Sequence, residues 1–133
     1  MVYKKLFPFI ITTAFVIIFF LGSSAGGDQW IKTELYFGMT KNSGGIVKQD
    51  EWDAFEDSVI VKVFSAGSTT IEGSGRWLNE NGDVIKEKTM VVISVNQMTP
   101  ELSAAIDAIR EKYKLYFSQS SVLRIDHPAG VSF

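Results

Sequence analysis

Apolar and polar residues alternate along TELYFG, residues 33–38, with the two-residue period of a β-strand. Leu35 and Phe37 share one face of this strand, while Glu34 and Tyr36 share the other. We predict a strand over 31–38. A strand with one apolar and one polar face is typical of a sheet that other elements cover on one side only.

The spacing of apolar residues changes twice in the next segments. Over 49–64 the apolar residues recur every three or four positions, which predicts a helix with Trp52 and Phe55 on its buried stripe. Over 69–78 the period of two returns and predicts a strand. Asn81-Gly82 is a strong hairpin signal and joins it to a return strand over 84–95, whose centre, TMVVISV, is apolar on both faces.

The last third of the chain predicts one helix and one strand. Thr99 is a suitable N-cap and Pro100 a suitable first residue for a helix that ends near Ser118. A strand follows over 121–125, and 131–133 is expected to form a short edge strand. The complete order is strand, helix, strand, strand, helix, strand.

This order predicts an α+β fold, the ferredoxin-like βαββαβ sandwich, over 33–133 as a single domain. Its four-stranded antiparallel sheet carries two helices on one face and leaves the other face open. In the strand order 4-1-3-2, the first strand lies in the interior of the sheet beside the third and fourth strands.

The beginning of the chain has a different character. MVYKK is followed by a long apolar run and then by the small residues SSAGG. This order is typical of a secretory signal peptide, predicted over 1–25 with a linker over 26–32. The alternative is a retained N-terminal membrane anchor, for which the run is slightly short. Both interpretations place the domain outside the cytoplasm, in the periplasm or secreted.

The charge and the cysteine content argue against several classes of function. Removing 1–25 takes away Lys4 and Lys5, which leaves 11 Lys and Arg against 15 Asp and Glu and a net charge of −4. An acidic domain is a poor nucleic-acid binder, because such binding depends on neutralising phosphates. The chain has no cysteine, which excludes disulfides and thiol catalysis.

Several stretches, in this order and spacing, also resemble a known family. They are TELYFG, EWDAF, GSGRW with NGDVIKE, AIDAIREKYKLYF, and QSSVLRI closing on VSF. The chain resembles an uncharacterised family of secreted bacterial proteins, domain of unknown function 3574 (DUF3574). The resemblance implies the fold and the compartment, and no activity. Lys48 and Glu56 depart from the family pattern and suggest a weaker first helix.

The candidate site is the open sheet face. We predict that Glu34 and Tyr36 lie there, because the apolar residues of the same strand should face the helices. Projecting the other strands onto the same face adds Glu72, Ser74, Arg76, Lys88, Met90, Val92, Ser94 and Arg124. An error of one residue in the phase of a strand would exchange its two faces.

Three functions remain open for this face. The first is a solvated or subunit-contacting surface in a homodimer. The second is a ligand site in which Arg76 or Arg124 holds a small anion, beside Glu34, Tyr36 and Lys88. The third is a metal-independent enzyme of dimeric α/β barrel type, with Glu34 as general base at a raised pKa and Tyr36 or Arg124 stabilising an oxyanion.

Cofactor and metal chemistry find little support in the sequence. His127 is the only histidine, so neither a multi-histidine metal site nor a cofactor is predicted. We expect an exported binding or interaction module at the cell envelope that contacts the membrane only through an uncleaved N-terminal segment.

Overall fold

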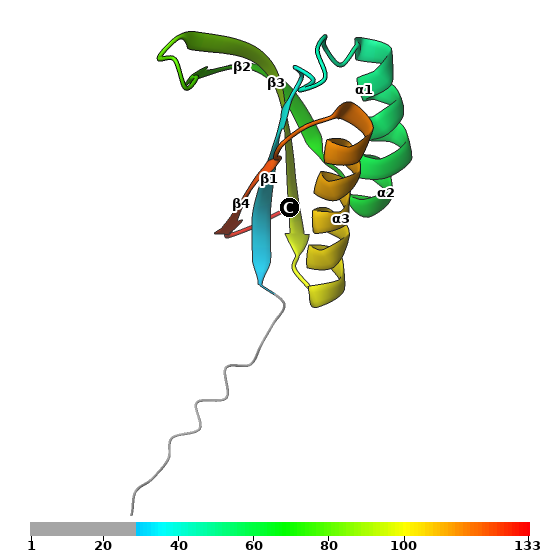
Figure 1. Ribbon diagram of the computed structural model, residues 1–133. Coiled ribbons are helices and arrows are strands. Elements are labelled where there is room, and N and C mark those ends of the chain that lie inside the picture. The colour runs from blue at the N-terminus through cyan, green and yellow to red at the C-terminus, as the bar shows by residue number, and fades with distance from the viewer. Residues whose placement is uncertain (1–28) are drawn as a thin grey trace, which may run out of the picture.

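The computed structural model describes residues 29–133 (Figure 1). The predicted signal segment, 1–25, and the first three residues of the predicted linker, 26–28, lie outside the described residues; the last three linker residues, 30–32, belong to the first strand of the structure. Within 29–133, no helix is both long and apolar enough to cross a membrane.

The described chain folds as one antiparallel sheet with helices on one face (Figure 1). The sheet order is β2-β3-β1-β4, the predicted ferredoxin-like order. The α+β prediction is therefore confirmed. The elements are β1 (Trp30–Gly38), α1 (Gln49–Phe55), η1 (Glu56–Ile60), α2 (Val61–Val63), β2 (Thr69–Leu78), β3 (Val84–Gln97), α3 (Pro100–Phe117) and β4 (Leu123–Pro128).

The core lies between the sheet and the helices. Leu35 and Phe37 of β1 are fully buried, as the alternation of that strand predicts. The Phe37 ring meets the rings of Trp52 and Tyr113 edge to face, with centroids 5.2 and 4.8 Å away. Such aromatic contacts add to the hydrophobic effect of burying the rings. The helices therefore attach firmly to one face and leave the other without helical cover.

Helix α3 starts and ends as the sequence predicts. The Thr99 side chain accepts a hydrogen bond from the backbone N–H of Leu102 at 3.1 Å, and Pro100 is the first helical residue. At the other end Ser118 has a φ of 50°, the left-handed conformation that commonly ends helices. β4 begins at Leu123, two residues later than predicted. The predicted edge strand over 131–133 is absent. The ring of Phe133 stays exposed and lies edge to face with that of Trp30, with centroids 5.8 Å apart.

The first helix contains one π-helical turn, η1, which begins at Glu56. Glu56 accepts a hydrogen bond from the indole N–H of Trp52 at 3.1 Å and another from the hydroxyl of Thr70. Upstream, the side chain of Glu51 accepts from the backbone N–H of Lys48 at 2.8 Å. The two departures from the family pattern are thus accommodated: Glu56 joins the helix to β2, and Glu51 caps the helix start without a Ser or Thr at 48.

Replacing Glu56 by leucine is expected to destabilise the fold by about 1–3 kcal/mol. The leucine would leave the N–H of fully buried Trp52 without its acceptor, and a buried unsatisfied donor costs about that much. Urea unfolding measures the change. The control Glu56→Gln keeps an acceptor and should lose less than half as much; equal losses for both variants would contradict the hydrogen-bond explanation.

Candidate functional site

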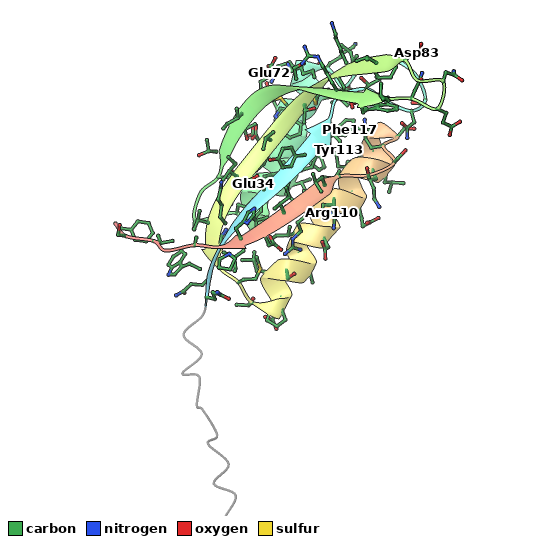
Figure 2. All side chains as sticks on the ribbon, turned by 90° about the vertical axis from the view of Figure 1, so that its left-hand side faces the viewer. Glu34, Glu72, Asp83, Arg110, Tyr113 and Phe117 are labelled. Atoms are coloured by element: carbon green, nitrogen blue, oxygen red, sulfur yellow. The ribbon has the colours of Figure 1, made fainter. Side chains whose placement is uncertain are left out.

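The open sheet face is apolar rather than polar, which corrects the sequence-based picture. Glu34, labelled in Figure 2, lies on it as predicted. Tyr36 lies on the same face by the alternation of its strand. The strand register places the following apolar residues on the same face: Ile71 and Trp77 of β2, Ile85, Val91, Ile93 and Val95 of β3, and Leu123 and Ile125 of β4. The face that the helices leave uncovered is therefore hydrophobic around a small polar centre.

The predicted phase was wrong for three strands. Met90, Val92 and Ser94 are buried beneath the helices, not on the open face. By strand alternation the helix side also carries Glu72, Ser74, Arg76, Lys88 and Arg124. The error has one physical cause: the charged and hydroxyl-bearing residues of these strands were assigned to the open face together with Glu34, whereas apolar side chains lie on both faces of the sheet.

Glu34 lies at the polar centre of the open face. Its carboxylate accepts a hydrogen bond from the Tyr36 hydroxyl at 2.7 Å and pairs with the Lys32 ammonium at 2.5 Å. Its cross-strand neighbours are Ile93 and Ile125. Only 14 % of the Glu34 side chain is exposed. Lys32, Glu34 and Tyr36 thus form a compact cluster with one ion pair, and His127 lies opposite Lys32 on the neighbouring strand.

The electrostatics of this centre favour an ionised carboxylate. Two hydrogen bonds hold the pKa of Glu34 below its ordinary value: the one from Lys32, which has the larger effect, and the one from Tyr36. The hydrogen bond to Glu34 raises the pKa of the Tyr36 hydroxyl. The sequence-based hypothesis of a catalytic base required a raised pKa at Glu34. The observed partners have the opposite effect.

Lys88 and Arg124, two of the predicted ligand-binding residues, have partners on the helix side. The Lys88 ammonium pairs with Glu72 at 2.8 Å. Arg124 is only 10 % exposed, and its guanidinium contacts the carboxylates of Asp107 and Asp126 at 3.1 and 2.9 Å. It also donates to the backbone carbonyl of Ser103 on α3 at 3.1 Å. Arg124 thus joins β4 to α3 and lies away from the open face.

A pocket of about 540 Å³ opens at one end of the open face. The outer part of the β2–β3 hairpin curls away from the helices toward this side (Figure 1). We call this hollow the hairpin pocket. It is lined by Tyr36, Gly38, Thr40, Asn42, Gly75, Arg76, Trp77, Ile85, Glu87, Thr89, Gln119, Ser120, Ser121 and Leu123. Of the five predicted site residues, it brings together Tyr36 and Arg76.

Glu87 is the acidic residue of the hairpin pocket, and it was not predicted. Its side chain lies across Gly38, where an added Cβ would be 2.6 Å from the Glu87 Oε1. That oxygen accepts a hydrogen bond from the backbone N–H of Thr40 at 2.8 Å. On the other side, Gly75 is the cross-strand partner of Glu87. The carboxylate thus lies against Gly38, a contact between strands that the sequence alone does not show.

Replacing Gly38 by alanine is expected to displace the Glu87 side chain. The new methyl would occupy the position of the carboxylate, so the bond to Thr40 would break at a cost of about 0.5–1.5 kcal/mol. Urea unfolding and the amide proton shift of Thr40 measure both effects. The matched control is Gly73→Ala, where the nearest atom to the added Cβ is the Thr89 carbonyl oxygen at an ordinary 3.7 Å. An unchanged Thr40 amide in Gly38→Ala would contradict the assigned contact.

Comparison with known proteins gives a family and a fold. Residues 32–133 match the family described as protein of unknown function, DUF3574. No curated protein matches the chain. Two structures of a phage SAM lyase are similar in fold: one in complex with S-methyl-5'-thioadenosine, with a TM-score of 0.58, and one in the apo state, with 0.57. Each is 13% identical and covers 77% of this chain, and the matches cover 83% and 82% of the lyase chains.

A third similar structure is CutA from Synechococcus elongatus, with a TM-score of 0.49 and 6% identity. The match covers 77% of this chain and 78% of the CutA chain. At 13% identity, the likeness to the two lyase structures shows a shared fold and nothing more.

Proposed function

The chain belongs to the DUF3574 family, whose function is unknown, and we propose that it is an exported binding module that acts as a homodimer through its open sheet face. One observation carries the proposal: the face without helices is apolar. Ile71, Trp77 and Leu123 on this face are each at least half exposed, at 50%, 54% and 55%. Contiguous apolar surface of this kind marks interaction sites in soluble proteins.

The size of the face fits a second copy of the chain. Four strands about 4.8 Å apart and roughly nine residues long span an area on the order of 600 Å². The protruding side chains add further surface to this area. Stable interfaces bury about 800 Å² per partner. A two-fold interface requires only that one patch complements itself.

The charge pattern of the face supports the same partner. Glu34 is paired with Lys32 on its own strand, so the centre of the face is locally neutral. Burying such a pair against apolar side chains costs less than burying an isolated charge.

The location at the cell envelope is supported by the sequence of residues 1–25. They combine a basic start, an apolar run and small residues, the order of an export signal. A domain outside the cytoplasm, joined to such a segment, would meet ligands or partners of the envelope. Membrane contact in this proposal comes only through that segment, if it is retained.

Catalysis by Glu34 is the weaker alternative. The lowered pKa of Glu34 makes it a poor proton acceptor near neutral pH, because the group is held in its ionised form by Lys32 and Tyr36. The phage lyase was solved in complex with S-methyl-5'-thioadenosine, which is a precedent for this fold holding a small organic molecule. This precedent supports a binding role as well as an enzymatic one.

Native mass spectrometry of the protein purified from its own host tests the proposal. We expect a dimer, and a retained extra mass would identify the class of ligand. A monomer at every concentration up to about 100 µM would contradict the homodimer, because the expected interface is of standard size. A complex of one copy of this chain with one copy of a different protein would also contradict the homodimer.

A further inference from the structure

We propose that the hairpin pocket binds an organic ammonium ion that carries an apolar or aromatic body. Glu87 would be its counter-ion, and the rings of Tyr36 and Trp77 would contact the body. This inference deepens the binding role proposed above and rests on it for its biological meaning, while the pocket itself is formed within one chain.

The first step of the argument is that Glu87 is oriented and lacks a cationic partner. The Thr40 N–H holds one carboxylate oxygen at 2.8 Å, and Gly38 leaves space for the side chain to lie flat on the sheet. The ion pairs formed within residues 29–133 engage other acids and leave Glu87 without a lysine or arginine. A fixed carboxylate in a concave, partly apolar site favours a cation.

The second step is the aromatic wall. Trp77 lies diagonally from Glu87 across the β2–β3 ladder, because Gly75 pairs with Glu87 and Trp77 pairs with Ile85. Diagonal neighbours on a sheet are within reach of an aromatic side chain. The indole is 54% exposed and stacks on no other ring of the described chain. Tyr36 provides a second ring from β1, and aromatic faces attract cations.

The third step is the size and rim of the pocket. Its volume of about 540 Å³ lies within the range of small-molecule sites, roughly 300–1,000 Å³. The rim is polar and already connected: the Gln119 amide donates to the Thr40 carbonyl at 2.6 Å, and the Asn42 amide donates to Ser120 at 2.7 Å. These groups give a bound molecule hydrogen-bonding partners at the mouth, while its charged end meets Glu87.

The same residues disfavour the small anion that the sequence led us to expect. Arg76 is the one cationic residue among those that line the pocket. By strand alternation its side chain belongs to the opposite face, whereas that of Glu87 belongs to the pocket face. An anion would therefore meet a fixed carboxylate without a facing guanidinium.

NMR titration with two matched probes tests this inference. Phenethylamine is a cation at pH 7, and 2-phenylethanol is its neutral counterpart with the same body. In the full-length protein we expect phenethylamine to shift the Thr40 amide and the Trp77 indole N–H saturably. Glu87→Gln keeps the acceptor for Thr40 and removes the charge, so its affinity for phenethylamine should fall about tenfold or more. The affinity for 2-phenylethanol should be the same in both proteins.

The control is Glu72→Gln, on the other face of the same hairpin, where Glu72 is 61% exposed and paired with Lys88. It should bind phenethylamine as the wild type does. Equal affinity of Glu87→Gln and wild type, absence of shifts at Thr40 and Trp77, or tighter binding of phenylacetate would each overturn the proposal. Sedimentation of the same samples separates the two claims: binding by a monomer would contradict only the homodimer, and a dimer that does not bind would contradict only the ligand site.

Discussion

Replacing Ile71 and Leu123 together by lysine is expected to convert the proposed dimer into a folded monomer. The two residues lie on the strands at opposite edges of the sheet, β2 and β4, and both belong to the open face. They are 50% and 55% exposed, so the single chain can accommodate lysine at both positions. In a dimer each change removes buried apolar surface and introduces a charge near its symmetry mate.

The expected size of this effect is large. Burying a side chain of the size of Leu or Ile is worth about 1.5–3 kcal/mol, and a dimer contains two copies of each. Even at half of that burial, the loss would be on the order of 4 kcal/mol, which weakens the dimer about a thousandfold. Sedimentation velocity over a range of concentrations measures the change in the association constant.

The matched control replaces two apolar residues that are at least as exposed but lie elsewhere. Ile46 in the loop before α1 is 65% exposed, and Leu115 on α3 is 78% exposed. Ile46→Lys with Leu115→Lys adds the same charge as the open-face variant and should remain dimeric. If the control dissociates equally, net charge rather than the open face governs association. If the open-face variant stays dimeric, the interface lies on another surface.

Replacing Arg124 by methionine is expected to lower the free energy of unfolding by about 2–4 kcal/mol. Methionine keeps an apolar stem but removes the contacts with Asp107, Asp126 and the Ser103 carbonyl. Hydrogen bonds to charged groups contribute about 1.5–3 kcal/mol, and the near-complete burial of Arg124 limits replacement by water. Urea unfolding measures the loss, and phenethylamine binding should be unchanged.

The control for Arg124→Met is Arg76→Met. Arg76 is exposed and belongs to no ion pair within residues 29–133, so its replacement should change stability by less than about 0.5 kcal/mol. Equal losses in the two variants would contradict the assignment of Arg124 as the residue that joins β4 to α3.

Acid unfolding provides a second measurement for Arg124. The hydrogen bond from Arg110, together with the one from Arg124, holds the pKa of Asp107 below its ordinary value of 3.8. A lowered pKa in the folded state gives stability that is present above pH 3.8 and is lost as the pH falls through the lowered value. Arg124→Met removes one of these two cations and should therefore lose less stability on acidification below pH 3.8 than the wild type. An unchanged acid dependence would show that Arg124 does not act on Asp107.

The sequence predicted the fold well because the decisive signals are local. The alternation of β1 placed Leu35 and Phe37 toward the core and Glu34 and Tyr36 on the open face, as found. Thr99 and Pro100 marked the start of α3 correctly. Once the order of helices and strands was correct, the ferredoxin-like arrangement followed from known topology.

The site was harder to predict because it depends on the phase of strands that give no clear alternation. Met90 to Val95 are apolar or small on both faces, so periodicity could not decide which residues lie under the helices. Assigning Arg124 and Lys88 to the open face followed from the assumption that this face is polar. Glu87 was missed because its position depends on Gly38 and on the Thr40 N–H, which come close to it only in the folded sheet.

The most direct test of the central claim, that two copies meet through the open sheet face, is an isotope-filtered nuclear Overhauser experiment on a mixture of labelled and unlabelled protein. It detects only contacts between different copies. We predict intermolecular signals between the methyl groups of Val91, Ile93 and Ile125, which surround Glu34 on the open face. Intermolecular signals confined to the helical side, or none at concentrations where the protein is dimeric, would contradict the account.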